Sequence, residues 1–169
     1  MSPHTWGFIG VLIGAFIGAS ASIITTIISN RNAIKIQSKL EKNNRELLFR
    51  EFQRETLLKI QEKISEGLRV VGKVHIEDVD NFRKTNKWGQ GLLDTDLDNK
   101  IANIYRELLY LKERIQKEGL RNEIKEVVGL MNSVLYSRSK IESEQGIINL
   151  IEKQETLSEN IGKELREYF

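Results

Sequence analysis

The chain has 169 residues with one proline and no cysteine, and 30% of its residues are charged. This length allows one modest domain with an appendage but excludes two full hydrophobic cores. The lack of cysteine excludes a disulfide framework and a thiolate metal site, and the composition favours a helical protein over a β-sandwich.

The net charge of +2 conceals a gradient along the chain. Residues 31–75 carry eleven Lys and Arg against six Asp and Glu, a net charge of +5, whereas residues 76–169 carry fifteen against eighteen, a net charge of −3. The basic excess directly follows an apolar segment, where anionic lipid headgroups attract positive charge. We therefore expect a lipid bilayer as partner. Direct nucleic-acid binding is the weaker alternative, because neighbouring glutamates dilute the basic face.

The first element in the chain is an apolar segment, residues 6–29, without an ionisable side chain. About 20 helical residues cross a bilayer core of about 30 Å, so residues 1–30 are predicted to be a transmembrane segment. A cleaved signal peptide is the alternative, because residues 19–21 resemble a cleavage site. Against it, the segment has no positive n-region, and its apolar run continues beyond residue 21.

The charges around this segment predict its orientation. No Lys or Arg precedes it, whereas five basic residues follow it closely. The positive-inside rule then places the N-terminus outside and residues 31–169 in the cytoplasm, with Trp6 as an interfacial anchor. We expect the protein in a bacterial inner membrane. The basic residues that flank the membrane are Arg31, Lys35, Lys39, Lys42 and Arg45.

Small side chains recur along one side of the apolar segment. At 100° per residue they occupy an arc of about 120°, and bulky apolar side chains take the opposite side. Small residues let two helix backbones approach closely in lipid, so this face predicts a homo-oligomer. A water-filled pore along the same face is a further hypothesis. The residues assigned to oligomerisation or pore lining are Gly10, Gly14, Gly18, Ser22 and Thr25.

The remaining residues predict an all-α cytoplasmic part, an antiparallel four-helix bundle. Residues 31–75 are expected to form a long stalk helix that enters the bundle after about residue 47. Residues 76–95 are expected to be a loop, and residues 96–169 the rest of the bundle. Asn43 and Asn44 interrupt the stalk's apolar stripe and argue against a strict long coiled coil. The stripe is Ile36, Leu40, Leu47, Leu48, Phe52, Leu57, Ile60, Ile64, Leu68 and Val71.

Three helices are expected after the loop. The first has strict 4-3 apolar spacing over residues 97–115, and Gly119 is expected to end it. The second runs from about residue 120 to 136, and the last begins at about Ser143. The inward positions of these helices are Leu97, Ile101, Ile104, Leu108, Leu111, Ile115, Ile124, Val127, Met131, Val134, Ile147, Ile151, Leu157, Ile161, Leu165 and Phe169.

Metal and cofactor motifs are rejected. The acidic triplet Asp94, Asp96 and Asp98 resembles the start of a calcium loop, but Asn99 and Tyr105 stand where that loop needs Gly and Glu. The triplet therefore predicts a helix N-terminus. Two histidines without cysteine exclude a familiar zinc site, and no phosphate-binding glycine loop occurs. We expect no cofactor.

The loop sequence FRKTNKWGQG, residues 82–91, places basic residues beside Phe82 and Trp88. Such a pattern can bind single-stranded nucleic acid. A neighbouring subunit or a membrane surface would suit it equally. The ordinary interpretation is a solvated loop whose tryptophan packs onto the bundle.

The sequence RVVGKVH places five residues between Arg69 and His75. This spacing resembles the R-x(4–6)-H signature of the HEPN superfamily, small helical bundles that include metal-independent ribonucleases. In active members the arginine stabilises phosphate charge and the histidine moves a proton. Val70 departs from the family pattern, in which the residue after the arginine is usually polar. The resemblance implies catalysis by Arg69 and His75 as an alternative to a non-enzymatic role.

The layout of the whole chain resembles the small membrane accessory proteins of type VI-B CRISPR systems, a divergent HEPN-like group. This resemblance implies a cytoplasm-facing homo-oligomer that forms a membrane pore and strengthens RNA-guided antiphage defence, with an RNA-guided effector as possible partner. Two alternatives stay open. One is a membrane-anchored scaffold that recruits a partner through residues 97–115, and the other is a membrane-tethered ribonuclease.

Overall fold

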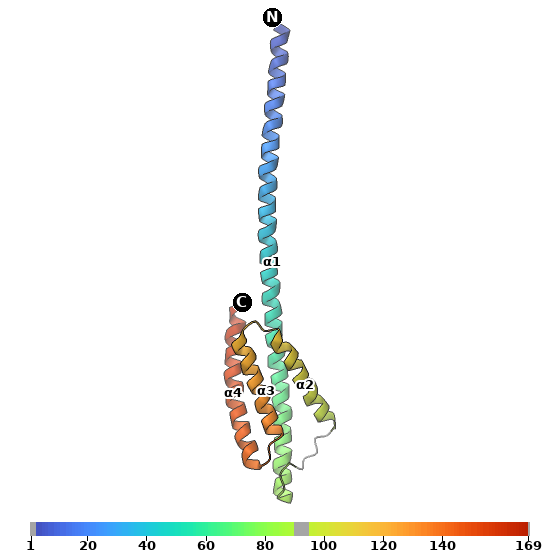
Figure 1. The fold of residues 1–169 in the computed structure, drawn as a ribbon, viewed down its shortest axis with the longest axis vertical. Coiled ribbons are helices and arrows are strands. Elements are labelled where there is room, and N and C mark those ends of the chain that lie inside the picture. Colours follow the sequence, from blue (N-terminus) through green and yellow to red (C-terminus); the bar gives the residue numbers. More distant parts are fainter. Residues whose placement is uncertain (1–2, 90–94, 169) are drawn as a thin grey trace. The chain divides into compact units, whose positions relative to one another are not determined.

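The computed structural model describes residues 3–89 and 95–168, and all regular structure in these residues is helical. The all-α prediction is therefore confirmed. The chain divides into two compact units, residues 1–48 and residues 49–169. The helices are α1 (Pro3–Thr85), α2 (Thr95–Glu113), α3 (Glu118–Leu135) and α4 (Lys140–Glu167) (Figure 1).

The N-terminal unit consists of the first part of α1. Pro3 stands at the first helical position, where its missing N–H costs no hydrogen bond. Three hydroxyl groups in this unit, those of Ser20, Thr25 and Thr26, each donate to the carbonyl four residues earlier at 2.8 Å. These donors are satisfied without water, as a helix in a lipid environment requires.

The C-terminal unit has a single hydrophobic core to which α1, α2, α3 and α4 all contribute. Each helix presents apolar residues at intervals of three or four, so one side of each is buried. Figure 1 shows α3 and α4 side by side, and these two helices pack closely. The most deeply buried apolar side chains are Leu57, Ile60, Val71, Leu108, Ile124, Val127, Met131, Leu150, Leu157 and Ile161.

Two glycines allow this close packing. A Cβ placed on Gly146 of α4 would lie 2.9 Å from Cγ2 of Val134 in α3. A Cβ on Gly67 of α1 would lie 3.1 Å from both Cε and Sδ of Met131 in α3. The missing side chains therefore leave the space that their neighbours fill, and larger residues would overpack the core.

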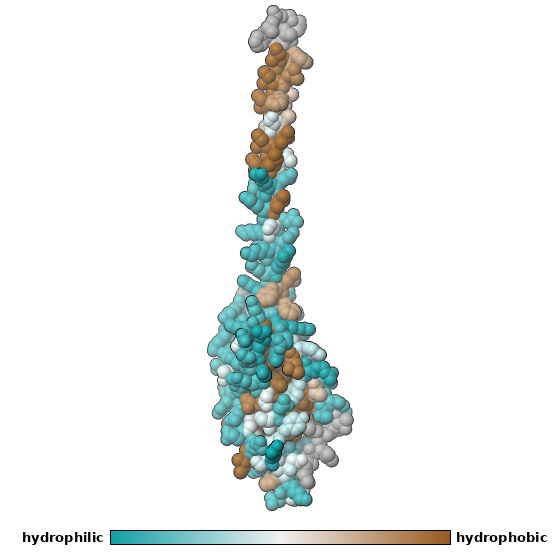
Figure 2. Space-filling view, in the orientation of Figure 1, coloured by the Kyte–Doolittle hydropathy of each residue, from teal (hydrophilic) through white to brown (hydrophobic). Residues whose placement is uncertain are grey.

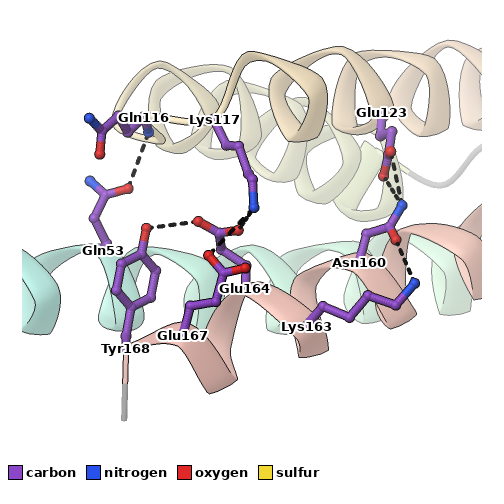
Figure 3. A network of polar contacts seen from close by, with 9 residues as sticks. All are labelled: Gln53, Gln116, Lys117, Glu123, Asn160, Lys163, Glu164, Glu167 and Tyr168. Carbon is purple, nitrogen blue, oxygen red and sulfur yellow. Dashed lines mark hydrogen bonds and ion pairs between the residues drawn. The ribbon is translucent and has the colours of Figure 1, made fainter.

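A buried amide connects α1 to the segment between α2 and α3. Gln53 of α1 is only 2% exposed. Its Nε2 donates to the carbonyl of Arg114 at 2.8 Å. Its Oε1 accepts from the backbone N–H of Gln116 at 3.2 Å (Figure 3). Because both polar atoms of the amide are bonded, its burial carries little desolvation cost.

A second polar cluster lies at the C-terminal end of α4. Glu164 is 6% exposed and forms an ion pair with Lys117, and the hydroxyl of Tyr168 donates to Glu164 Oε1 at 2.9 Å (Figure 3). Burial, together with this hydrogen bond, raises the pKa of Tyr168 to about 12. The hydrogen bond to Glu164 also raises the pKa of Lys117. The carboxylate is thus compensated by two donors.

The prediction of a loop over residues 76–95 is wrong for its first half, because α1 continues to Thr85. The buried face of α1 also continues, through Val74 and Asp78, so packing favours helix there. The helix ends at Asn86, whose positive φ of 55° is a left-handed conformation that asparagine tolerates. Asp94, one of the acidic triplet, lies outside the described residues.

Helix boundaries later in the chain also differ from expectation. Gly119 ends no helix; it is the second residue of α3. Helix α4 begins at Lys140 rather than near Ser143, because Ser139 caps it by accepting from the N–H of Glu142 at 3.2 Å. Phe52 and Ile151, expected to point inward, are 44% and 56% exposed. At the start of the core, α1 buries Gln53 instead of Phe52, since Gln53 bonds the α2–α3 connection.

Candidate functional site

The apolar part of α1 is the first candidate. One helix among the described residues, α1, is by length and composition apolar enough to cross a membrane. Figure 2 shows this part of the N-terminal unit as a hydrophobic stretch followed by a hydrophilic one. Length and composition agree with the predicted span.

The small residues of this segment share one side of an uninterrupted helix. A Cβ placed on Gly10, Gly14 or Gly18 would meet nothing within 4 Å apart from its own helix backbone. At 100° per residue these glycines share an arc of about 120° with five other small residues. We call the whole set the small-residue face. Its members are Gly7, Gly10, Gly14, Gly18, Ala21, Ser22, Thr25 and Ser29.

The hydroxyl group of Thr25 on this face has limited freedom to bond a partner helix. Thr25 donates its proton to the carbonyl of Ala21 within the same helix. Its oxygen keeps lone pairs that can accept a further hydrogen bond. The carbonyl of Ser22 accepts from Thr26 in the same way. Backbone approach at the glycines is therefore the larger source of helix–helix attraction that this face offers.

The five basic residues after the apolar segment also share one side of α1. Arg31, Lys35, Lys39, Lys42 and Arg45 are all exposed. Their spacing places them within an arc of about 120°. We call this set the basic face. Such a row suits contact with anionic headgroups. Each Lys or Arg near an anionic membrane surface contributes about 1 kcal/mol to the free energy of membrane binding.

Arg69 and His75 are not brought together. Six residues apart on α1, they point in directions about 120° apart. Arg69 lines an open cavity of about 420 Å³ together with Glu66, Lys73 and Lys100. His75 instead lies against α4, where its Nδ1 is 2.7 Å from Oγ of Ser143. The structure pairs the histidine with a buried serine and gives it no contact with the arginine.

Trp88 packs onto the helical unit, as the ordinary interpretation of its loop predicted. Its indole N–H donates to the carbonyl and to Oγ of Ser137, at 3.1 and 3.3 Å. Its ring lies edge-on to Phe82 with centroids 6.1 Å apart, and 6.3 Å from the ring of His75. These contacts hold the tryptophan as part of the folded unit.

The apolar seam of residues 97–115 faces the protein's own core. Ile101, Ile104, Leu108 and Leu111 are all buried there. This seam is therefore not a free surface for a partner, as the scaffold alternative would need. No group of three or more metal-ligating side chains occurs within residues 3–89 and 95–168.

Gln53 and Glu164 are two buried polar residues that the sequence did not lead us to expect. Both occupy positions in phase with buried apolar neighbours: Gln53 precedes Leu57 by four residues, and Glu164 follows Ile161 by three. A polar residue in the apolar row of a helix signals a buried hydrogen-bond network. That signal was present in the sequence, but the bonding partners lie far along the chain.

Comparison with known proteins finds no match to a protein-family model, to a curated protein or to a solved structure.

Proposed function

We propose that this protein is a homo-oligomeric, single-pass protein of the bacterial inner membrane whose assembly permeabilises or depolarises that membrane. The small-residue face carries the proposal, because it is open in the single chain and lies on a helix apolar enough to span a bilayer. Lipid tails are as apolar as leucine, so only close packing and hydrogen bonds draw such helices together.

The basic face supports a cytoplasmic location for the residues that follow the span. Arg31, Lys35 and Lys39 stand immediately after the apolar segment, and the sequence before it has no Lys or Arg. Positive charges are retained on the cytoplasmic side, so the N-terminus faces outward in this proposal. The helices of residues 49–169 then form an antiparallel bundle on the cytoplasmic side. The resemblance to accessory proteins of type VI-B CRISPR systems adds a use for this assembly, RNA-guided antiphage defence.

Replacing both Gly14 and Gly18 with leucine is expected to disperse the oligomer, because the added side chains separate the helix backbones. Light scattering of the full chain in detergent, over a series of protein-to-detergent ratios, measures the particle mass. The control replaces Ala19 and Ser20 with leucine, which places the same two leucine side chains outside the small-residue face. A single subunit for the unchanged chain at every ratio contradicts the proposal, and so does equal dispersal of both double variants.

Dye release from vesicles separates permeabilisation from mere anchoring. The unchanged chain and the Ala19→Leu/Ser20→Leu control are expected to release an enclosed dye, whereas the Gly14→Leu/Gly18→Leu variant retains it. An intact oligomer that releases no dye or ions would favour the anchored scaffold. In that case its partner would have to bind a surface other than the buried seam of residues 97–115.

A further inference from the structure

A second row of residues in the N-terminal unit follows the small-residue face. Ala33, Ile36, Leu40, Asn43 and Leu47 follow one another at intervals of three and four, as the first and fourth positions of two heptads and the first position of a third. We call them the 33–47 seam. Ile36, Leu40 and Leu47 are 62%, 56% and 62% exposed, so three large apolar side chains in phase face solvent.

The 33–47 seam lies on the same side of α1 as the small-residue face. At 100° per residue, the centres of the two rows differ by only about 40° around an ideal helix. The basic face, in contrast, is centred about 140° from the seam. The apolar surface therefore points away from the charges and continues the side on which the glycines stand.

We propose that the 33–47 seam packs against the same seam of a second copy of the chain, as a short parallel coiled coil. This inference rests on the homo-oligomer of the proposed function and extends its contact surface beyond the apolar segment. The occupant is a second copy because identical spans inserted in the same direction present identical seams at the same height above the membrane. A helix of another protein would not be held at the matching height by an identical span.

The residues that border the seam are compatible with self-association. In a parallel coiled coil, a residue of the seventh heptad position faces the fifth position of the next heptad on the partner. Lys39 then faces Asn44 of the other copy, and Asn32 faces Gln37. Neither of these two pairs sets like charges opposite each other. The next pair, Glu46 facing Glu51, sets two carboxylates opposite each other at the end of the seam farthest from the apolar segment. Contact through the basic face would instead oppose five basic side chains of each copy. Charge thus favours the seam over the opposite side of the helix.

Two heptads are too short for a stable coiled coil on their own, since sustained association usually needs three or four. The preceding apolar segment supplies the missing stability, because packed spans hold the seams at a high effective concentration. Asn43 fits this arrangement. A single polar residue in a seam lowers the stability of the contact but favours the one register in which the asparagines meet.

The matched pair Ile36→Ser and Ile34→Ser tests the inference in the full chain in detergent. Ile34 is the same residue type, is 66% exposed and lies outside the seam, about 160° from Ile36 around the helix. We expect Ile36→Ser to raise the protein concentration at which the oligomer half-dissociates by about tenfold, through lost apolar burial, and Ile34→Ser to leave it unchanged. Equal effects of the two substitutions overturn the seam.

Cysteine cross-linking gives a second measurement that does not depend on weakening the assembly. The chain has no native cysteine. Leu40→Cys lies in the seam and should form a disulfide between copies under mild oxidation, because facing seam residues come within disulfide reach. Ser38→Cys lies on the far side of the helix and should not. Equal cross-linking at both positions overturns the proposal.

The outcomes separate this inference from the function on which it rests. Loss of the oligomer in the Gly14→Leu/Gly18→Leu variant, with Ile36→Ser behaving as Ile34→Ser does, removes the seam and leaves the proposed function standing. A monomeric unchanged chain at every protein-to-detergent ratio removes both.

Discussion

Two glycines of the C-terminal unit differ from the glycines of the small-residue face. A Cβ added at Gly67 or Gly146 of the C-terminal unit would lie 3.1 or 2.9 Å from a side chain of α3, so the partner of each glycine lies within the same chain. Gly10, Gly14 and Gly18 of the N-terminal unit face nothing within 4 Å. The same residue type thus completes a packed contact at Gly67 and Gly146 and leaves an uncovered surface on the small-residue face.

Substitutions by alanine break this comparison most directly. Gly146→Ala is expected to lower the free energy of unfolding of the C-terminal unit by about 1–3 kcal/mol, because the added Cβ overpacks against Val134. Gly129→Ala is the control, since a Cβ on this glycine of α3 meets nothing within 4 Å. It should instead raise stability by about 0.5–1 kcal/mol through helix propensity.

Denaturant unfolding of the full chain in detergent measures both changes. The fluorescence of Trp88, in a Trp6→Phe background, reports on the C-terminal unit because its indole is bonded to Ser137. If Gly146→Ala and Gly129→Ala change the free energy of unfolding in the same direction, the distinction between glycines that face a neighbouring side chain and glycines that face none is contradicted.

A smaller effect on the free energy of unfolding is expected from Gln53→Leu. This substitution removes a buried polar contact of the C-terminal unit. The carbonyl of Arg114 and the N–H of Gln116 lose their partner. Both residues are exposed, so water replaces part of the bonding, and we expect a loss of about 1 kcal/mol. Gln61→Leu is the control on the same helix. Unchanged stability in Gln53→Leu, measured by the Trp88 transition, would show that the amide does not hold the connection.

The smallest expected effect is a dependence of stability on alkaline pH, confined to the C-terminal unit. Tyr168 and Lys117 both have a raised pKa in the folded protein, that of Tyr168 about 12 against an ordinary value of 10. A raised pKa means that the folded state holds the proton more tightly. Their stabilising contribution is therefore complete below pH 10 and is lost as the pH rises from 10 toward 12.

The Trp88 unfolding midpoint, measured in steps between pH 9 and pH 12, follows this loss. Tyr168→Phe should make the decline shallower, because its hydroxyl no longer titrates, whereas Tyr110→Phe on the exposed side of α2 should leave the decline as it was. Parallel profiles for Tyr168→Phe and the unchanged chain would contradict the assignment.

Periodicity predicted much of the C-terminal unit. The apolar positions of residues 97–115 and of the helix after Gly119 recur at three and four residues, and the structure buries Ile104, Leu108 and Ile124 as expected. Helix ends were predicted less well, because Ser139 and Asn86 end or begin helices through local hydrogen bonds and a left-handed conformation. The continuation of α1 to Thr85 depends on burial of Val74 and Asp78, which turn-forming residues nearby concealed.

The candidate site divides in the same way. The small-residue face and the basic face are properties of consecutive residues on one helix, so helical geometry alone specifies them from sequence. Arg69 and His75 also share a helix, but the hydrogen-bond partner of His75, Ser143, comes from α4. Their spacing along the sequence suggested a catalytic pair. In the structure, His75 contacts Ser143, and Arg69 lines an open cavity.

By itself, the sequence determined the helical class, the apolar segment with its small-residue face, and the charges that follow it, because each depends only on neighbours within a few turns of one helix. Tertiary structure alone decided which residues the core covers. It buried Gln53 and Glu164 beside their distant partners, turned Phe52 outward and closed the seam of residues 97–115 inside the protein. These outcomes depend on contacts between residues far apart in the chain, which a local pattern does not contain.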